Sequence, residues 1–305
     1  MVPTFLNAPH VQSLSEIGNI KGCMGFLGIP WDLGSIYGKG AAQAPVVIRK
    51  ASQHFDGYHL ECDLSLAELP LVDLGDISQA DFKTTLNGQT IRFLQDCLRE
   101  IYSTINILDL LLIAGGDHLI TAASFLPTKP NNSVLLWVDA HLDLMDAYPN
   151  EKKWTNSTVL RRTIELSTVS HENIWIIGTH GYDHGPEELE YVRKYGIHYF
   201  PLHKLRSNKK SILEKILNAI SEKEYVYMSV DIDVLDPAYA PGTLARAPGG
   251  LTPQELFHLI RKLAPYLDVL DLVEIYPNHD PLGITAEIAA ATLIEACAYR
   301  FHIQI

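Results

Sequence analysis

The chain has 305 residues, of which 47% are hydrophobic and 20% are charged, and its formal net charge at pH 7 is −12. This length can form one large α/β domain or two smaller ones, and the composition is that of an ordinary globular protein. The negative charge argues against nucleic acids and anionic membranes as partners.

Targeting signals and cysteine usage are the next constraints. No basic segment followed by an apolar run opens the sequence, and no uncharged apolar run approaches the roughly 18 residues that span a bilayer. The four cysteines lack C-x-x-C spacing. We therefore expect a cytoplasmic protein with no signal peptide, no membrane span and free thiols.

Short apolar runs that predict strands alternate with helical patterns along the chain. The predicted strands are residues 25–29, 71–74, 110–114, 134–138, 174–177, 198–201, 225–230 and 269–275. Residues 252–263 predict a helix, because Thr252 and Glu255 form a capping box before an apolar stripe, and residues 285–298 predict another. This alternation predicts a mostly parallel sheet with helices on both faces. No linker or repeat divides it, so we expect a single domain over residues 1–305, with residues 1–20 as an N-terminal arm.

Two acidic motifs follow predicted strands. One is Asp139-Ala140-His141-Leu142-Asp143, and the other is Asp231-Ile232-Asp233. Residues two apart on a strand point to the same side, so the acidic side chains of each motif are expected to converge. Four carboxylates so close together repel one another in a poorly solvated cleft. The pattern therefore predicts two divalent metal ions, whose charges balance the four aspartates.

A third motif, Gly115-Gly116-Asp117-His118, follows the predicted strand 110–114. A lone histidine after two glycines is more often structural than a ligand. Together with the acidic motifs, however, His118 supplies a sixth ligand. Two imidazoles and four carboxylates suit a hard or borderline ion such as Mn²⁺.

These three motifs resemble the signatures of the ureohydrolases, the family of arginase, agmatinase, guanidino-acid hydrolases and formimidoylglutamase. Further segments with the same resemblance are Phe26–Pro30, Ala240–Thr243, Pro248–Leu251, Val273–Pro277 and Asp280–Thr285. The resemblance implies a three-layer α/β/α fold on an eight-stranded, mostly parallel sheet and a binuclear manganese centre, with Ni²⁺ as an alternative metal. It also implies a homotrimer or homohexamer.

The resemblance assigns ligands position by position. One metal is expected on His118, Asp139, Asp143 and Asp231, and the other on Asp139, His141, Asp231 and Asp233. Three residues are expected to be catalytic: Asp233 as the proton relay to the leaving amine, together with His141 and Glu274. Glu274, at the end of the last predicted strand, is suited to grip a planar guanidinium by bidentate hydrogen bonds.

The substrate tail is where the chain departs from the family pattern. Asn156 stands where agmatinases and arginases usually place a histidine, and an Asn there is closer to the formimidoylglutamases. In and after the loop that follows strand 174–177, Asp183, Glu187 or Glu188 could pair with a terminal amine on the tail, and His180 could instead face a carboxylate. Thr243, in the family's substrate-side loop, is a further candidate. Solvated loop side chains are an equally good reading of His180 and Asp183.

The sequence therefore predicts a binuclear metal hydrolase that cleaves a C–N bond of a linear guanidine or amidine. The small cationic substrate that we favour is agmatine, which would give putrescine and urea. Formimidoylglutamate and guanidino acids such as guanidinobutyrate are the alternatives, and arginine fits the segments around Asn156 and Asp183 less well. A non-catalytic relative is the competing class, but an intact ligand set argues against it.

Overall fold

The structure, a computed structural model, describes residues 3–11, 22–55, 57–78, 87–102, 108–127 and 129–302, except for the side chain of Glu100. Residues 1, 2 and 12–20 of the predicted N-terminal arm lie outside the described residues. Phe5 is buried, and its ring stacks on Phe26 at a centroid distance of 4.5 Å. This part of the arm thus packs against the sheet, while the single-domain assignment stays a prediction.

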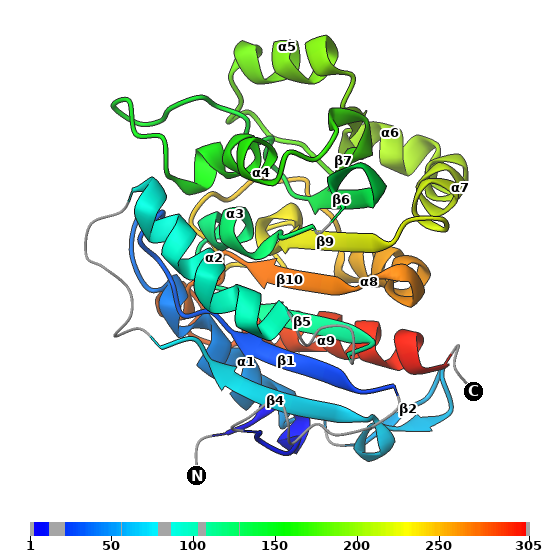
Figure 1. Ribbon diagram of the computed structural model, residues 1–305. Helices are drawn as coiled ribbons and strands as arrows, with labels where there is room; N and C mark the ends of the chain where they lie inside the picture. Colours follow the sequence, from blue (N-terminus) through cyan, green and yellow to red (C-terminus); the bar gives the residue numbers. More distant parts are fainter. Residues whose placement is uncertain are drawn as a thin grey trace.

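All eight predicted strands are present, and they form one parallel sheet (Figure 1). In sheet order they are β4 (Leu71–Asp76), β1 (Met24–Gly28), β5 (Leu110–Ala114), β10 (Val269–Val273), β9 (Tyr225–Asp231), β6 (Ser133–Val138), β7 (Ile174–Ile177) and β8 (His198–Phe200). A short antiparallel pair that the sequence did not predict, β2 (Tyr58–His59) with β3 (Leu64–Ser65), lies outside this sheet.

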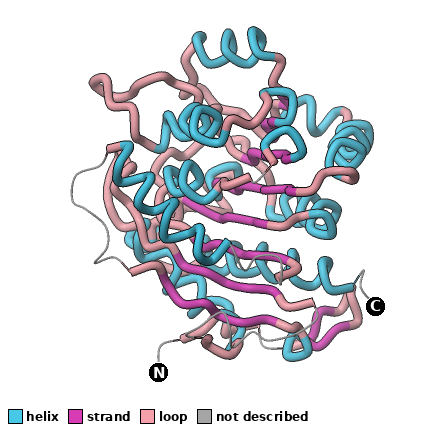
Figure 2. Tube along the Cα trace, in the orientation of Figure 1, coloured by secondary structure: helices cyan, strands magenta, loops and turns pink. Residues whose placement is uncertain are grey.

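Helices cover both faces of the sheet, which gives the expected three layers (Figure 2). Alternate residues of β5 show the division: Leu110 and Leu112 belong to one hydrophobic cluster, and Leu111 and Ile113 to the other. The first face carries α1 (Ala44–Ser52), α6 (Leu202–Ser207), α7 (Lys209–Ile220), α8 (Pro253–Leu263) and α9 (Ile284–His302). The second carries α2 (Gly88–Tyr102), α3 (Thr121–Ser124), α4 (Val159–Ser167) and α5 (Pro186–Tyr195).

The last strand in the chain, β10, occupies the middle of the sheet, between β5 and β9. It is two residues shorter than predicted. Glu274 has a left-handed backbone with φ of 65°, so the extended conformation stops at Val273. This break places the Glu274 side chain beyond the strand end.

The two predicted helices are confirmed. Thr252 caps α8 by accepting a hydrogen bond from the backbone N–H of Glu255 at 3.2 Å, and the Glu255 side chain completes the capping box. The helix predicted over residues 285–298 continues as α9 to His302. Among the described residues, no helix has the length and apolar character needed to cross a membrane.

Candidate active site

The strands that precede the predicted ligands are neighbours at the centre of the sheet. β5, β10, β9 and β6 lie side by side and run in the same direction, so their carboxyl ends share one edge. His118 follows β5, Asp139 follows β6 and Asp231 ends β9. Binding sites in parallel α/β sheets form at this edge.

The acidic side chains of the first motif lie close together, but not because alternate residues of a strand point to the same side, as was predicted. β6 ends at Val138, and Asp143 has a left-handed backbone with φ of 52°. Asp139 Oδ1 accepts a hydrogen bond from the backbone N–H of His141 at 2.6 Å. The motif is therefore a loop folded on its own first carboxylate, which is a common use of Asp beyond a strand.

The second acidic motif also leaves its strand. Asp233 lies in the 3-10 turn Ile232–Val234, directly beyond β9. Asp231 Oδ1 accepts a hydrogen bond from the backbone N–H of Asp233 at 2.8 Å, and both side chains are 3% exposed. Short-range capping thus gathers these carboxylates.

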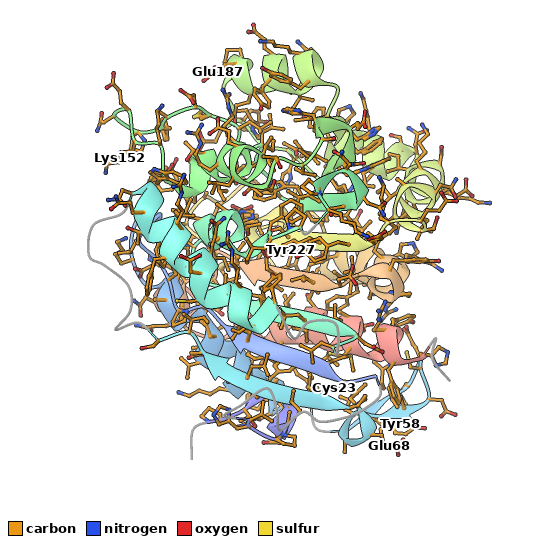
Figure 3. All side chains as sticks on the ribbon, viewed as in Figure 1. Cys23, Tyr58, Glu68, Lys152, Glu187 and Tyr227 are labelled. Carbon is orange, nitrogen blue, oxygen red and sulfur yellow. The ribbon has the colours of Figure 1, made fainter. Side chains whose placement is uncertain are left out.

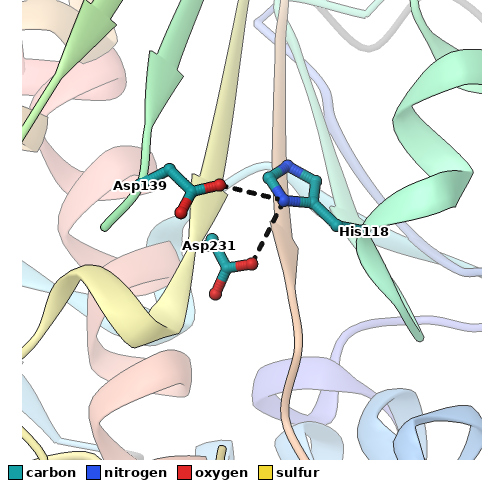
Figure 4. Close-up of side chains that lie close together, drawn as sticks. All are labelled: His118, Asp139 and Asp231. Atoms are coloured by element: carbon teal, nitrogen blue, oxygen red, sulfur yellow. Dashed lines mark ion pairs between the residues drawn. The ribbon is translucent and has the colours of Figure 1, made fainter. Parts of the chain in front are cut away.

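His118 is surrounded by three carboxylates. Its Nδ1 lies 3.2 Å from Asp139 Oδ2 and 3.1 Å from Asp231 Oδ2, the two pairs drawn as dashed lines in Figure 4. Asp143 Oδ2 lies 3.4 Å from the same nitrogen. His118, Asp139 and Asp231 are all buried, and their ligand atoms are close enough to hold one metal ion.

His141 forms a second group that shares Asp139 with the first. Its Nδ1 lies 3.4 Å from Asp139 Oδ1 and 3.2 Å from Asp233 Oδ2. The ligand atoms of these three residues could hold another ion. Asp139 offers one oxygen to each group, as a bridging carboxylate between two metal ions does.

Unpaired buried atoms test whether this donor set fits a metal. His118 Nδ1, Asp139 Oδ2 and Asp233 Oδ1 are buried, and none makes a hydrogen bond of good geometry with another described residue. Buried polar atoms without partners are costly, and metal coordination is one way to satisfy them. Imidazole nitrogens with carboxylate oxygens, and no thiolate, fit a hard or borderline divalent ion.

The pKa values show the same electrostatic tension. Burial and the charges of neighbouring aspartates raise the pKa of Asp231 well above its usual value, and the same causes raise the pKa of Asp143. For His118, burial favours the neutral ring, but the neighbouring carboxylates of Asp139 and Asp231 outweigh it and raise the pKa well above the usual value. Without cations, the protein alone would therefore hold extra protons here.

A buried network supports His118 from behind. Its Nε2 lies 2.9 Å from Ser229 Oγ, and the Ser229 hydroxyl donates to Asp271 Oδ1 at 2.6 Å. The imidazole stacks on Trp137 at a centroid distance of 4.1 Å. Partners of this kind fix the orientation of a metal-binding histidine.

Asp271 is fully buried in β10 and anchors this network. Its Oδ2 accepts hydrogen bonds from the Thr121 hydroxyl at 2.7 Å and from the Tyr227 hydroxyl at 2.5 Å. Tyr227 lies in the interior, whereas Lys152 and Glu187 are exposed at the periphery (Figure 3). Asp271 was not predicted from the sequence, although an aspartate inside an apolar strand is a usable signal.

Glu274 lies beside the first ligand group. Its carboxylate is 3% exposed, and Oε1 accepts a hydrogen bond from the backbone N–H of His118 at 2.6 Å. Burial raises the pKa of Glu274 to about 7. Because its bonds come from protein donors, the carboxylate is oriented before any ligand arrives.

Asn156 lies beside Glu274 in the lining of the pocket described below. It opens the turn Asn156–Thr158, and its Nδ2 lies 3.4 Å from Glu274 Oε1, with Asn156 as the donor. Its Oδ1 is buried and has no hydrogen-bond partner among the described residues. That oxygen is available to accept a hydrogen bond from a substrate.

A pocket opens over these groups and encloses about 480 Å³ between protein atoms, part of it open to solvent. It is the cavity into which both acidic motifs and Glu274 face. Its lining consists of Tyr37, His141, Asp143, Met145, Tyr148, Asn156, Ser157, Asp183, Glu188, Asp231, Asp233, Ala245 and Glu274.

The mouth of the pocket joins two distant loops. Asp183, predicted as a tail contact, is exposed and accepts a hydrogen bond from the Tyr37 hydroxyl at 3.1 Å. Glu188, by contrast, already accepts backbone hydrogen bonds on both oxygens, from Leu144 and Gly185, each at 2.9 Å. Asp183 is therefore the more accessible carboxylate for a substrate tail.

His180 and Thr243 are not among the lining residues. Both ring nitrogens of His180 face backbone carbonyls, those of Gly178 at 2.8 Å and Ala247 at 3.0 Å. Thr243 is 1% exposed. Their substrate contacts stay predictions.

The aromatic lining residues Tyr37 and Tyr148 were not predicted from the sequence, although the glycine-rich segment around Tyr37 follows a strand at the same sheet edge.

Comparison with known proteins gives the family. The model of the arginase family matches residues 23–298, which is most of the chain. The chain belongs to the arginase family. It is 31% identical to the formimidoylglutamase of Halalkalibacterium halodurans over 94% of this chain and 93% of that protein. It is 30% identical to the guanidinobutyrase of Pseudomonas aeruginosa over 96% and 91% of the two chains.

A solved structure agrees with the fold. The agmatine ureohydrolase of Thermoplasma volcanium superposes with a TM-score of 0.80 at 26% identity and covers 96% of each chain. This member of the arginase family is thus a hydrolase that acts on linear guanidino or amidino compounds. The relatives act, by their names, on different compounds, so family membership leaves the substrate to be argued from the pocket.

Proposed function

We propose that this arginase-family member hydrolyses agmatine to putrescine and urea, with two Mn²⁺ ions held by His118, Asp139, His141, Asp143, Asp231 and Asp233. The supporting observation is the charge of the pocket. Three described lining residues that are not assigned to the metals, Asp183, Glu188 and Glu274, are carboxylates, and none of the described lining residues is a lysine or an arginine.

Charge separates the candidate substrates. Agmatine carries a guanidinium at one end and an ammonium at the other, whereas guanidino acids and formimidoylglutamate carry carboxylates on their tails. A carboxylate tail beside Asp183 is repelled, and no described cationic lining residue compensates for it. An ammonium tail meets Asp183 and the faces of Tyr37 and Tyr148, which favour a cation.

The chain's own residues then have separate tasks. Glu274 binds the planar cation at its nitrogens and orients the central carbon. Asp233 Oδ1 makes no hydrogen bond with another described residue, so this atom is the one we assign to carry a proton to the leaving nitrogen. Asn156 cannot titrate and serves as a hydrogen-bonding group. When bound, the two metal ions supply a water activated for attack near neutral pH.

Formimidoylglutamate is the second candidate, and a specific observation favours it. Asn156 replaces the histidine usual in agmatinases, and the formimidoylglutamase named above is a full-length relative. An enzyme of that specificity, however, must hold two substrate carboxylates in a pocket whose described lining offers Asp183 and Glu188 and no lysine or arginine.

A substrate panel separates these candidates. Mn²⁺-loaded protein is assayed for urea release from agmatine, 4-guanidinobutyrate and arginine, and for formamide release from formimidoylglutamate. We expect the highest kcat/KM with agmatine, and Asp183→Asn should lower that value while improving the relative rate with 4-guanidinobutyrate. A preference for formimidoylglutamate, or no turnover of any compound, contradicts the proposal. The cytoplasmic location and the trimeric or hexameric state stay predictions.

A further inference from the structure

One donor to the Glu274 carboxylate has no role in the chemistry proposed above. Two of the three residues that bond Glu274, His118 and Asn156, already belong to the site. The third is Tyr276, whose hydroxyl lies 3.0 Å from Glu274 Oε2. Tyr276 is 0% exposed, so this contact is shielded from water.

Tyr276 is itself oriented by a residue from a distant part of the chain. Its hydroxyl lies 2.7 Å from Ser35 Oγ, and its backbone N–H donates to the carbonyl of Gly242 at 2.7 Å. The Tyr276 hydroxyl is the donor in both contacts, so its single proton is shared between Glu274 Oε2 and Ser35 Oγ, and Ser35 helps to fix the position of that hydroxyl.

Ser35 lies in the 31–40 segment, which follows β1. Two backbone hydrogen bonds connect this segment to residues of the site. The Ser35 backbone N–H donates to Asp117 Oδ2 at 2.8 Å, and Asp117 directly precedes His118. The neighbouring carbonyl of Gly34 accepts a hydrogen bond from the backbone N–H of Asn156 at 3.1 Å. The segment therefore has a fixed position relative to the metal-binding groups.

The same segment reaches the mouth of the pocket two residues later. The hydroxyl of Tyr37 donates to Asp183 Oδ2 at 3.1 Å. Burial, together with the charge of Asp183, raises the pKa of Tyr37 to about 12, so the hydroxyl keeps its proton at neutral pH. Ser35 and Tyr37 thus connect one segment to the two carboxylates at opposite ends of the proposed substrate.

We propose that the 31–40 segment is the positioning element for both substrate-binding carboxylates: Ser35 holds Glu274 through the Tyr276 hydroxyl, and Tyr37 holds Asp183. The inference rests on the proposed function, in which Glu274 binds the guanidinium and Asp183 binds the ammonium. A carboxylate fixed in advance loses less entropy when it binds a cation. The spacing of Ser35 and Tyr37 on one segment then sets the distance between the two charges that the pocket accepts.

The test compares agmatine with butylguanidine, which has the same guanidinium on a four-carbon chain without the ammonium. Tyr276→Phe should lower kcat/KM for both compounds by about tenfold to a hundredfold, which is the effect of losing one hydrogen bond to a charged group. Tyr37→Phe should lower kcat/KM for agmatine about fivefold more than it lowers kcat/KM for butylguanidine. The selectivity for agmatine then falls by the same factor.

A double-mutant cycle shows whether Ser35 acts through Tyr276. Ser35→Ala should lower kcat/KM by about threefold, and the Ser35→Ala/Tyr276→Phe double variant should match Tyr276→Phe within about twofold. The matched control is Tyr191→Phe on the outer helix α5, which removes a hydroxyl that lies 3.0 Å from His171 Nε2. This variant should leave kcat/KM unchanged for both substrates. Elemental analysis should give the same metal content for all variants.

A second readout does not need turnover. The affinity of the Mn²⁺-loaded protein for guanidinium ion, measured by calorimetry, should fall about tenfold in Tyr276→Phe and stay unchanged in Tyr37→Phe. The inference is overturned if the effects of Ser35→Ala and Tyr276→Phe on kcat/KM multiply in the double variant. It is also overturned if Tyr37→Phe lowers kcat/KM equally for both substrates, or if Tyr276→Phe leaves the affinity for guanidinium ion unchanged. If the wild-type protein hydrolyses neither compound, the proposed function is overturned. If the Tyr276→Phe variant nevertheless binds guanidinium ion more weakly than the wild type, the positioning of Glu274 is supported.

Discussion

The floor of the pocket and its mouth are built in different ways. On the floor, Asp231 and Asp233 are each 3% exposed, and Asp231 is held by the backbone N–H of Asp233. At the mouth, Tyr37 is 50% exposed and Tyr148 is 37% exposed. Rigid, buried groups suit chemistry that every member of a family shares, while exposed loop residues can change without disturbing it. Relatives of about 30% identity carry different substrate names, and a mouth built from exposed loop residues is the part of the pocket in which such differences would be tolerated.

The largest effect is expected at the carboxylate that the two ligand groups share. Asp139→Asn removes one charge from both groups at once, so the protein should lose both metal ions and its kcat/KM should fall by at least about a thousandfold. Elemental analysis and urea release measure the two effects, and the exposed Asp96→Asn on α2 is the control. Retention of both metals in Asp139→Asn contradicts the shared role.

Glu274 marks the boundary between the floor and the mouth. Glu274→Gln keeps the size of the side chain but removes its charge, so kcat/KM should fall about a hundredfold because a charged hydrogen-bond acceptor for the guanidinium is lost. Metal content should stay near two ions per chain, as in the exposed control Glu222→Gln. If the metals leave with the charge, Glu274 is a ligand and belongs to the floor.

The buried network behind His118 gives a smaller, one-sided effect. Asp271→Asn should lower the affinity of the His118 group for its metal ion by about 10- to 100-fold, which is the range found for residues that orient a metal ligand. The affinity of the His141 group should stay the same. A Mn²⁺ titration followed by electron paramagnetic resonance should then show two unequal affinities. Asp268→Asn, three residues earlier and hydrogen-bonded to the backbone N–H of Val226 at 2.7 Å, is the control for burial. Equal weakening of both metals argues for a general loss of stability instead.

The smallest effect is expected at Asn156, on the side of the mouth. Asn156→Ala should lower kcat/KM by about fivefold, or on the order of 1 kcal/mol, because one neutral hydrogen bond is lost. Asn156→His should change substrate preference more than metal content. A loss of several orders of magnitude in Asn156→Ala, with metals and fold retained, shows that the amide has a larger role; no effect at all places it outside the reaction.

The same contrast explains what the sequence could predict. Strand positions followed from apolar runs and are confirmed, and the shared edge of the parallel sheet brings His118, Asp139 and Asp231 together. The local geometry did not follow, because Asp143 and Glu274 adopt left-handed backbones that no periodicity reveals. Contacts across the mouth were the hardest to predict.

The pairing of Tyr37 with Asp183 shows why. These residues are 146 positions apart, and each lies in a loop whose path depends on the packing of the elements around it. Asp271 is a different case. Its residue type and its place in an apolar strand were visible, but its hydrogen-bond partners come from elsewhere in the chain.

The position of β10 has a consequence for how the protein is made. The ribosome delivers β1, β4 and β5 first and β6 to β9 next, but these two groups of strands have no direct pairing in the finished sheet. Only β10 joins them, by pairing with β5 on one side and β9 on the other. Because domains fold as units during vectorial synthesis, the central seam stays open until residues 269–273 have left the exit tunnel. His118 and Asp231 come from opposite sides of that seam, so the His118 group is complete only after translation has passed the last strand, whereas Asp139, His141 and Asp233 all lie on one side of it.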